Sequence, residues 1–373
     1  MKINLKNLGI TELKEALEGL GLKGYRADEV RKWLYQKQVS SFADMTNVSK
    51  DNRELLASKF EMPRLSVKKV QVSEDGTRKY LIELPDGKAV ESVLIPSEEA
   101  NKPALPVVSA GVRGACEARR PEGPSTGSAP RSNRLTLCVS SQVGCAMDCH
   151  FCLTATMGFL RNLSVFEIVE QVAVVIRESG ERMSNLVFMG MGEPLANTGN
   201  LYKALEILLD PLGFNFSRQH ITVSTSGLAP QIEKFGDNTP VKLAISLNAT
   251  TDEVRDQIMP INKKYPLERL LDSLKKMHLP KRNRITFEYV MLHGVNDTID
   301  DAKRLVGILS TMKAKINLIP FNPFPGSPYK RPPDDWVLKF QKVLLDKGYV
   351  ANIRKSRGRD ILGACGQLAT ETS

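Results

Sequence analysis

Hydrophobic and polar residues change their spacing along the chain, and each spacing predicts a different kind of element. Near the N-terminus, apolar residues recur every three or four positions in "TELKEALEGL", "YRADEVRKWLYQK" and "SKDNRELLASKF", which predicts helices. Over residues 66–96 apolar and polar residues alternate, with turn signals at Asp75-Gly76 and Asp86-Gly87. Residues 1–96 are therefore expected to form an accessory domain of helices and one small antiparallel sheet.

Residues 97–133 show no sustained hydrophobic period. The segment is rich in Pro, Gly, Ala, Ser and Arg, which favours a linker or a surface insertion. Its single cysteine, Cys116, is expected to be an idle thiol.

From residue 134 to residue 355, short apolar stretches alternate with longer amphipathic ones. Helices are expected in "LERLLDSLKKMH", in "TIDDAKRLVGIL" and over residues 164–179, where Ser164 and Glu167 form a capping-box pattern. Six β/α units in series predict a parallel sheet with right-handed crossovers, either open and doubly wound or closed into a partial barrel. The predicted strands are Leu135–Ser140, Asn185–Gly190, His220–Thr225, Lys242–Leu247, Arg284–Leu292 and Lys315–Pro320.

Composition narrows the class of protein. The length of 373 residues suits one large catalytic domain with a smaller companion. Its 42% hydrophobic and 25% charged residues are typical of a soluble globular protein, and no run reaches the ~20 apolar residues of a membrane helix. The N-terminal stretch lacks a signal-peptide core, so the cytoplasm is the expected compartment. A formal net charge of +10 fits a polyanionic partner such as nucleic acid, or simply a solvated basic face.

Unusual polar and glycine-rich stretches follow the predicted strands. In parallel α/β folds, ligands bind at the carboxyl ends of the strands. Here "GCAMDCHFC" follows the first strand, "FMGMGEP" ends the second, and "STSG", "SLNA" and "PFNPF" follow later ones. These five stretches are therefore expected to converge on one rim of the sheet.

Three of the six cysteines, Cys145, Cys149 and Cys152, lie within eight residues. In a reducing compartment such cysteines are more often ligands than disulfides. Four cysteines would complete a 4Fe-4S cluster or a structural zinc site, whereas three leave one metal ion open to a further ligand. A zinc site completed by His150 or by a distant cysteine is the alternative. The C-x3-C-x2-C spacing is similar to the signature of the radical S-adenosylmethionine (SAM) superfamily, which implies a 4Fe-4S cluster.

The second stretch, Gly190–Pro194, is suited to holding SAM. Glycines let a ligand approach the backbone, and Glu193 can accept hydrogen bonds from an ammonium group. The string resembles the superfamily's glycine-glutamate-proline motif, although an ordinary strand-end turn would have the same composition. The other residues expected to contact SAM, each of which could instead form a cap or a turn, are Gly192, Ser224, Ser246, Leu247, Asn248 and Asn322.

Longer motifs extend the resemblance. "VESVLIP", "LCVSSQVGCAMDCHFC", "FMGMGEPLAN", "INLIPFNPFPG" and "RGRDILGACGQL" together resemble the RlmN/Cfr family of radical-SAM RNA adenine methyltransferases over most of the chain. The resemblance implies a partial (β/α)6 radical-SAM barrel over residues 134–355 and a C-terminal catalytic tail over residues 356–373. It departs at two places: residues 97–133 interrupt a connection that is usually short, and Asn248 stands where a histidine is common.

The resemblance also implies a reaction that uses two SAM molecules per turnover. Cys365, helped by a low thiol pKa, would take a methyl group from the first, and a radical generated from the second would remove hydrogen from this S-methylcysteine. The carbon radical would add to the adenine ring and give a transient protein–RNA adduct. Glu91 matches the family's proton acceptor, and Cys138 matches the thiol that frees the product by forming a disulfide with Cys365. Without the resemblance, Cys138 would be an ordinary core cysteine.

Within the family, "CVSSQVGC" and "GMGEPLAN" are most similar to the carbon 2 branch, RlmN. The implied substrates are an adenosine in the peptidyl-transferase region of 23S ribosomal RNA and the adenosine 3′ of the anticodon in tRNA. The other implied partner is a flavodoxin or ferredoxin as electron donor, with the enzyme acting as a monomer. Four basic residues of the first helices are candidate RNA contacts or parts of a solvated face: Arg26, Arg31, Lys32 and Lys37.

Three other functions stay open at this point. The first is carbon 8 methylation of ribosomal RNA by a member of the same family. The second is a radical-SAM reaction on a non-RNA substrate, for which Glu91, Cys138 and Cys365 would be dispensable. The third is a non-enzymatic RNA-binding protein with structural zinc in place of iron.

Overall fold

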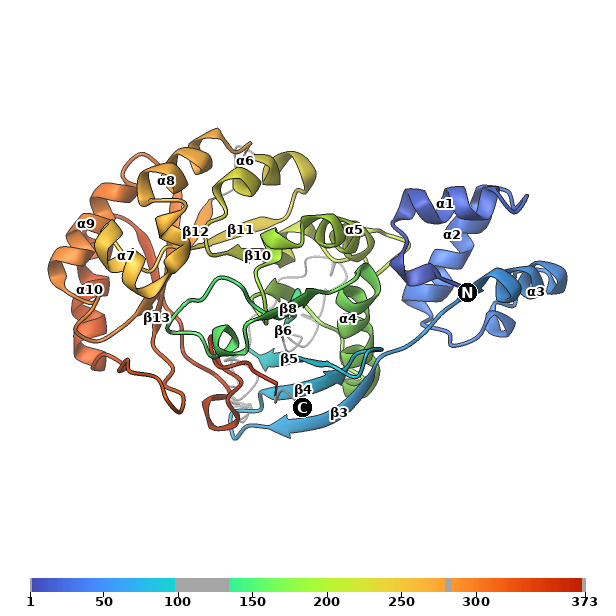
Figure 1. Cartoon of the computed structure of the whole chain (residues 1–373), viewed down its shortest axis with the longest axis horizontal. Coiled ribbons are helices and arrows are strands. Elements are labelled where there is room, and N and C mark those ends of the chain that lie inside the picture. The colour runs from blue at the N-terminus through green and yellow to red at the C-terminus, as the bar shows by residue number, and fades with distance from the viewer. Residues whose placement is uncertain (1, 98–133, 279–283, 371–373) are drawn as a thin grey trace, which may run out of the picture.

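A curved sheet, a layer of outer helices and a separate helical module make up the molecule (Figure 1). The computed structural model describes residues 2–97, 134–278 and 284–370. Most of the expected insertion, residues 98–133 with Cys116, therefore lies outside the described residues. No helix in the described ranges combines the length and the apolar character needed to cross a membrane.

The N-terminal module is helical, as the spacing of its apolar residues predicts. Its elements are β1 (Ile3–Asn4), α1 (Ile10–Glu18), α2 (Tyr25–Arg31), α3 (Lys50–Lys59) and β2 (Phe60–Glu61). The two short strands pair in parallel, and α2 continues into a π-helical turn over Lys32–Gln36. A fully buried ion pair joins the module to the larger body, with Lys6 Nζ 2.8 Å from Glu170 Oε2.

Ten strands form one continuous sheet, in the order β14-β13-β12-β11-β10-β9-β6-β5-β4-β3. Neighbouring strands from β6 to β14 run parallel, whereas β3, β4, β5 and β6 pair antiparallel. The small predicted sheet is thus an extension of the larger one. The strands are β3 (Ser66–Val72), β4 (Arg78–Glu83), β5 (Ala89–Pro96), β6 (Leu135–Cys138), β9 (Asn185–Phe188), β10 (Ile221–Thr225), β11 (Lys242–Ser246), β12 (Ile285–Met291), β13 (Ala314–Pro320) and β14 (Val350–Ile353). A separate hairpin pairs β7 (Gln142–Gly144) with β8 (Phe159–Asn162).

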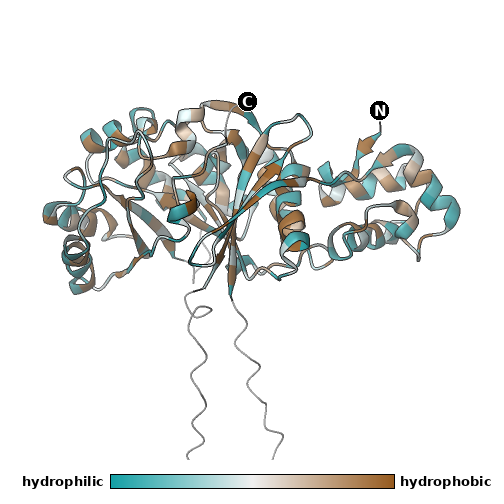
Figure 2. Ribbon diagram, turned by 90° about the horizontal axis from the view of Figure 1, so that it is seen from below, coloured by the Kyte–Doolittle hydropathy of each residue, from teal (hydrophilic) through white to brown (hydrophobic). Residues whose placement is uncertain are grey.

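Helices follow the strands and flank the outer face of the curved sheet, as in a partial barrel (Figure 1). Figure 2 shows strands that are largely hydrophobic and helices with hydrophobic and hydrophilic sides. The predicted capping box is present, because Ser164 Oγ accepts from Glu167 N and Glu167 Oε2 accepts from Ser164 N. The helices are α4 (Val165–Ser179), α5 (Thr198–Leu209), α6 (Ala229–Asn238), α7 (Asp252–Ile258), α8 (Leu267–Lys276), α9 (Ile299–Leu309) and α10 (Asp334–Asp346).

All six predicted strands form, as β6, β9, β10, β11, β12 and β13, with bounds within two residues of those expected. The sequence did not predict β14. This strand is a four-residue edge strand whose residues are mostly exposed or half-buried, so it shows no clear hydrophobic period.

Candidate functional site

The inner face of the sheet carries polar side chains at its centre. In-register parallel pairing puts Ser246, Glu288 and Asn317 side by side on β11, β12 and β13. Loops beyond the strand ends fold over this row and form a cavity of about 990 Å³ that opens to solvent. All five stretches expected to converge contribute to its lining, so that prediction is confirmed.

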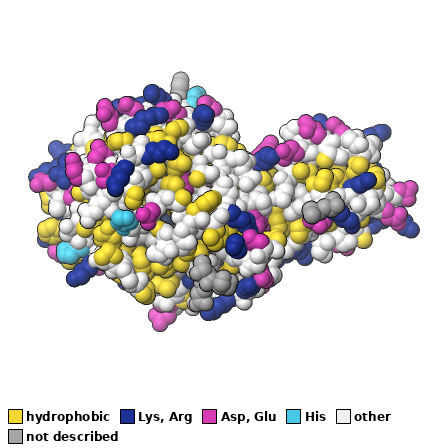
Figure 3. Space-filling model, in the orientation of Figure 1, with side chains coloured by type: hydrophobic (Ala, Val, Ile, Leu, Met, Phe, Trp, Pro, Cys, Tyr) yellow, Lys and Arg dark blue, Asp and Glu magenta, His cyan; other side chains and the backbone are white. Residues whose placement is uncertain are grey.

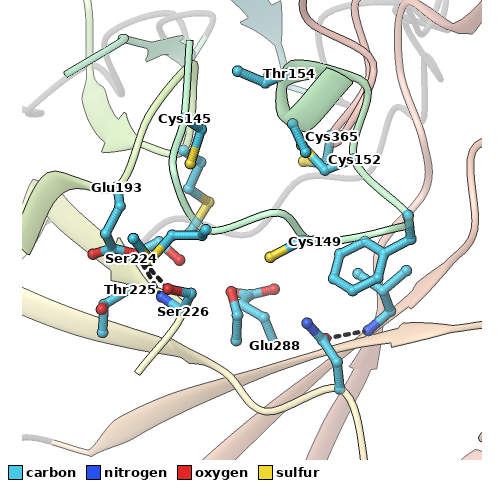
Figure 4. A pocket seen from close by; sticks show the side chains of 18 of the residues that line it. Cys145, Cys149, Cys152, Thr154, Glu193, Ser224, Thr225, Ser226, Glu288 and Cys365 are labelled. Carbon is cyan, nitrogen blue, oxygen red and sulfur yellow. Dashed lines mark hydrogen bonds between the residues drawn. The ribbon is translucent and has the colours of Figure 1, made fainter. Parts of the chain in front are cut away.

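Cys145, Cys149 and Cys152 line one side of this cavity, and their sulfur atoms surround one common space (Figure 4). They lie on the loop after β7. Gly144 starts this loop with a φ of 73°, and a Cβ there would lie 1.8 Å from the carbonyl oxygen of Gly158, so only glycine permits the turn. Burial raises the pKa of all three thiols, to about 12 for Cys145. Their thiolates therefore need a positively charged partner such as iron.

The zinc alternative is not supported by the side-chain arrangement. The His150 ring is 45% exposed, lies 3.8 Å from the Asp148 carboxylate and does not line the cavity. In the ranges that the structure describes, no three His, Cys, Asp or Glu side chains are grouped as ligands of one metal ion. Three sulfurs spread around a common space suit a 4Fe-4S cluster, which distributes its cysteines over different iron atoms.

Glu193 lies on another side of the same cavity (Figure 4). Its Oε1 accepts a hydrogen bond from Leu195 N (2.9 Å), and its Oε2 accepts from Ser226 N (2.7 Å) and Ser226 Oγ (2.9 Å). Burial raises the pKa of Glu193, and these hydrogen bonds partly oppose that shift. Gly192 next to it has a φ of 95°, and a Cβ there would lie 2.4 Å from Gln142 Cβ. The carboxylate is thereby fixed in place to accept hydrogen bonds from an ammonium group.

Ser224, Ser246, Asn248 and Asn322 line the cavity as predicted, but Leu247 does not. The Leu247 side chain is fully buried in the core. The Asn248 side chain is partly engaged, because its Oδ1 accepts from Val290 N at 2.8 Å. Asn322 is 3% exposed, and within the described residues its Oδ1 has no hydrogen-bond partner. This oxygen can accept a hydrogen bond from a ligand in the cavity.

Cys365 lines both this cavity and a second one, which Cys138 also lines. Four hydrogen bonds hold the tail here: Gly366 O accepts from Leu153 N (2.7 Å), Leu368 O from Thr154 Oγ1 (2.6 Å), Cys365 O from Asn322 Nδ2 (3.1 Å), and Pro323 O from Gln367 Nε2 (2.7 Å). Cys365 itself is exposed and lines both cavities. The expected low thiol pKa is wrong for this arrangement, because burial first and the Glu288 carboxylate second raise the pKa of Cys365.

Glu91 lies apart from the two cavities and lines a third. Its Oε1 is 2.9 Å from Lys79 Nζ, and its Oε2 accepts from Ala369 N at 3.1 Å. Burial raises the pKa of Glu91, and the Lys79 ammonium partly lowers it. The β5–β6 register pairs Val93 with Cys138, so Glu91, two residues earlier, has its side chain on the same sheet face as Cys138. The structure thus brings Cys138 and Cys365 together and leaves Glu91 further along the same face.

Comparison with known proteins agrees with this site. Residues 139–306 match the "Radical SAM superfamily" and residues 3–62 match the "Ribosomal RNA large subunit methyltransferase N-terminal domain". A "Dual-specificity RNA methyltransferase RlmN" of Geotalea uraniireducens is 49% identical over 367 residues, covering 98% of this chain and 96% of the relative. The chain belongs to the RlmN family. A relative of the same name from Nitratiruptor is 45% identical and covers 95% of each chain.

A solved structure supports the same fold for this RlmN-family chain. The crystal structure of a radical SAM methyltransferase from Sphaerobacter thermophilus matches with a TM-score of 0.81 and 35% identity, covering 98% of this chain and 99% of the other. The expected fold class and family resemblance are therefore confirmed. The radical SAM family implies a 4Fe-4S cluster and SAM, and the three free thiols, the buried carboxylate and the unpaired Asn322 oxygen described above fit these groups.

The sequence did not single out two buried charged residues of this RlmN-family site. Glu288 interrupts an apolar strand, lines both the first and the second cavity, and accepts a hydrogen bond from Asn317 Nδ2 at 2.8 Å. Arg255 is 0% exposed and stands three residues before Ile258 on the buried face of α7. In the sequence, each of them is a charged residue at a position where the spacing of the apolar residues predicts a buried side chain.

Arg255 ties together the loops that follow β10 and β11. Its Nη2 donates to Ser226 O (2.7 Å) and Ser246 O (3.2 Å), and its Nε donates to Leu247 O (3.0 Å). The guanidinium fork reaches three carbonyl groups in fixed directions, which a lysine ammonium cannot do. Arg255 therefore positions the cavity wall that carries Ser224, Ser246 and Asn248.

Arg255→Lys is expected to lower the free energy of unfolding by about 3 kcal/mol, because buried carbonyl groups lose their charged donor. SAM binding is expected to weaken about tenfold as the cavity wall shifts, which corresponds to about 1.4 kcal/mol. Urea unfolding and equilibrium SAM binding would measure these effects. The control is Arg269→Lys, whose pair with Glu233 is partly exposed and is expected to change stability by less than about 0.5 kcal/mol. Equal effects of both substitutions would contradict this role of Arg255.

Proposed function

We propose that this chain methylates carbon 2 of adenosine, in the peptidyl-transferase region of 23S ribosomal RNA and 3′ of the anticodon in tRNA. The observation that carries the proposal is the position of Cys365, whose side chain lines both the cavity of the three cysteines and the cavity of Cys138. The printed name of the relatives, dual-specificity RNA methyltransferase, supports RNA as the substrate class.

Cys145, Cys149 and Cys152 would hold the cluster. SAM would be held by Glu193 at its amino group, and by hydroxyl, amide and backbone groups of Gly192, Ser224, Ser246, Leu247, Asn248 and Asn322. When bound, the cluster and SAM supply the electron and the radical chemistry that this reaction needs. Such chemistry is required because carbon 2 of adenine is electron-poor and a sulfonium methyl group is itself an electrophile, so direct polar transfer between them is disfavoured.

Cys365 would act first, as a thiolate that accepts a methyl group from one SAM molecule. Desolvation by the surrounding residues and the Glu288 carboxylate raise the pKa of this thiol, whereas an approaching sulfonium cation favours the thiolate. Methylation then leaves a neutral thioether. A second SAM molecule per turnover is required, since the delivered methyl group has to be activated after it reaches Cys365.

Glu91 would take the proton from carbon 2 of the radical adduct, which would also return one electron to the electron-transfer chain. Cys138 would then attack the Cys365 sulfur: the disulfide forms as the carbon–sulfur bond breaks, and the released carbon takes the electron pair and a proton to become the product's methyl group. Cys138 and Cys365 already share a cavity. Glu91 is engaged by Lys79 and by Ala369 of the tail, so the tail is expected to shift when RNA binds. Gly363 and Gly366 flank Cys365 and give this part of the tail the backbone freedom that such a movement requires.

The remaining assignments follow from the same scheme. A flavodoxin or ferredoxin would supply the electron to a monomeric, cytoplasmic enzyme. Residues 1–96 would be an accessory region whose strands β3, β4 and β5 extend the core sheet, 97–133 an insertion, 134–355 the radical-SAM core and 356–373 the catalytic tail. In the N-terminal module Arg26 pairs with Glu29 and Arg31 with Asp28 and Asp210, which leaves the exposed Lys32 and Lys37 as the better candidates for RNA contact.

Nucleoside analysis tests this function directly. The purified protein would react anaerobically with SAM, a reductant and either transcribed 23S ribosomal RNA or tRNA, and the digested RNA would be examined by mass spectrometry. We expect 2-methyladenosine from both RNAs. Formation of 8-methyladenosine without 2-methyladenosine would establish the carbon 8 reaction instead, and SAM cleavage without any methylated nucleoside would indicate a non-RNA substrate.

A further inference from the structure

A groove lined by lysines lies on the open face of strands β3, β4 and β5. Its volume is about 1720 Å³, and its lining includes Lys68, Lys69, Lys79 and Lys88, with Glu91 at the same surface. Figure 3 shows a group of Lys and Arg side chains near the centre of the drawn face. The groove is distinct from the cavity of the three cysteines, since the two have no lining residue in common.

The register of the sheet connects this groove to the reacting residues. Lys69 pairs with Leu81, and Leu81 pairs with Glu91, so these three side chains lie on one face. Glu91 shares that face with Cys138, as the β5–β6 pairing requires. The opposite face is covered by α4, where Gln171 accepts a hydrogen bond from Ser92 Oγ at 2.9 Å. One sheet face therefore carries Lys69, Glu91 and Cys138 in order from the edge strand β3, and Glu91 and Cys138 are buried next to the C-terminal tail.

Two lysines of the groove are free to bind an anion. Lys68 pairs with Glu83 at 2.8 Å, and Lys79 pairs with Glu91 at 2.9 Å. Lys69 and Lys88 are exposed, and neither forms an ion pair with any carboxylate of the described residues. Unneutralised ammonium groups at the rim of a groove attract phosphate.

The other wall of the groove is partly apolar. Met157 and Leu160, next to and within β8, line it, and Leu160 is 46% exposed. The basic Arg161 that follows is not available, because Asp86 and Glu167 each lie 2.8 Å from its guanidinium. The groove thus combines lysines on one side with apolar side chains on the other, against which a ribose or a base can pack.

We propose that this groove binds the single-stranded RNA segment next to the target adenosine, with Lys69 and Lys88 contacting its phosphates. The proposal rests on the proposed function, since it names where the RNA of that reaction lies. The tail forms the end of the groove through Ala369, which also donates to Glu91. An RNA strand in the groove therefore contacts the same segment that carries Cys365, and it leads the unstacked adenine toward Glu91 and Cys138.

An acidic protein such as the electron donor is the other anionic partner that lysines could attract. The groove favours RNA over such a protein for two reasons. It ends at Glu91 and the tail rather than at the cysteines that would hold the cluster, and an electron donor has to approach the cluster. It is also a lined groove with an apolar wall, which suits an extended strand.

The test is the salt dependence of RNA binding by Lys69→Gln/Lys88→Gln. Binding of a fluorescently labelled anticodon stem-loop would be measured by anisotropy at several salt concentrations. Loss of two phosphate contacts to single-stranded RNA is expected to reduce the slope of log K against log salt by about 1.4, or about 25-fold weaker binding at 0.1 M salt when the two proteins are matched at 1 M. Iron content and SAM binding should equal those of the wild type, which shows that the fold is intact.

Lys313→Gln/Lys347→Gln is the matched control, because it removes the same charge from exposed lysines at the far end of the barrel. This control is expected to keep the wild-type slope. Equal slopes for the wild type and the groove variant, with methylation proceeding, would overturn the groove proposal and leave the proposed function standing. Slower reduction by flavodoxin with unchanged RNA binding would also overturn it. Wild-type protein that neither binds nor methylates RNA would instead count against the proposed function.

Discussion

Cys365→Ala is expected to abolish RNA methylation while iron content and SAM binding stay at wild-type levels. The substitution removes the sulfur that would carry the methyl group, and loss of an enzyme's nucleophile costs about 10⁴-fold or more in rate. It leaves the backbone contact from Asn322 Nδ2 to Cys365 O, and it touches none of the three cysteines of the first cavity. The effect should therefore be confined to the chemistry.

Three measurements check this expectation. Nucleoside mass spectrometry would show no 2-methyladenosine, intact-protein mass spectrometry would show no added methyl group after incubation with SAM, and equilibrium binding would show unchanged SAM affinity. Cys365→Ser, which keeps a polar group of similar size, should be as inactive as the alanine variant. Methylation near the wild-type rate in either variant would remove Cys365 from the mechanism.

The sequence predicted the elements of the sheet because buried strands leave a strong pattern. The six strands from β6 to β13 that belong to the continuous sheet are short apolar runs followed by amphipathic helices, and all six form. The sequence did not predict which strands pair with each other, because alternation over residues 66–96 predicts strands but not their partners. The pairing of β5 with β6 is what places Glu91 and Cys138 on one face.

The sequence predicted those residues of the site that lie at or just beyond the ends of strands. Residues at the carboxyl ends of parallel strands meet by topology, so the sequence alone groups the three cysteines, Glu193 and Asn322. Arg255 was missed because its contacts are carbonyl groups, which the sequence does not reveal. The pKa of Cys365 was predicted in the wrong direction, because desolvation depends on packing of the tail against the barrel.

The C-terminal tail links Glu91, the proposed base, with Cys365, the proposed methyl carrier. Its residues Asp360 and Gly358 are held at the β3–β4 turn by Ser73 Oγ (2.5 Å) and Asp75 Oδ2 (2.9 Å), and Ala369 is held by Glu91. Cys365 lies between these two anchors, in the loop that faces the cavities. Between the two anchors, Gly366 O accepts from Leu153 N, Leu368 O accepts from Thr154 Oγ1, and Gln367 Nε2 donates to Pro323 O. A shift of the tail that exposes Glu91 therefore has to break these bonds as well, and it would move the proposed base and the proposed methyl carrier together.

Cys138→Ala is expected to accumulate a covalent protein–RNA adduct, because the second sulfur proposed to resolve it is absent. In the proposed mechanism the steps before resolution use only Cys365 and the groups of the first cavity, so adduct formation should proceed. Cys138 is 6% exposed, and its loss should cost stability by only about 1 kcal/mol, since one sulfur atom is removed from a site next to an existing cavity.

The adduct would appear as a band of lower mobility in a denaturing gel after anaerobic reaction with RNA, and nuclease treatment would remove the shift. Cys138→Ala/Cys365→Ala provides the matched control, because without the methyl-carrying sulfur no adduct can form and no shifted band is expected. Multiple turnovers by Cys138→Ala at the wild-type rate would show that another group resolves the adduct. Absence of both product and adduct would mean that Cys138 acts earlier, for instance by keeping Cys365 in position across their shared cavity.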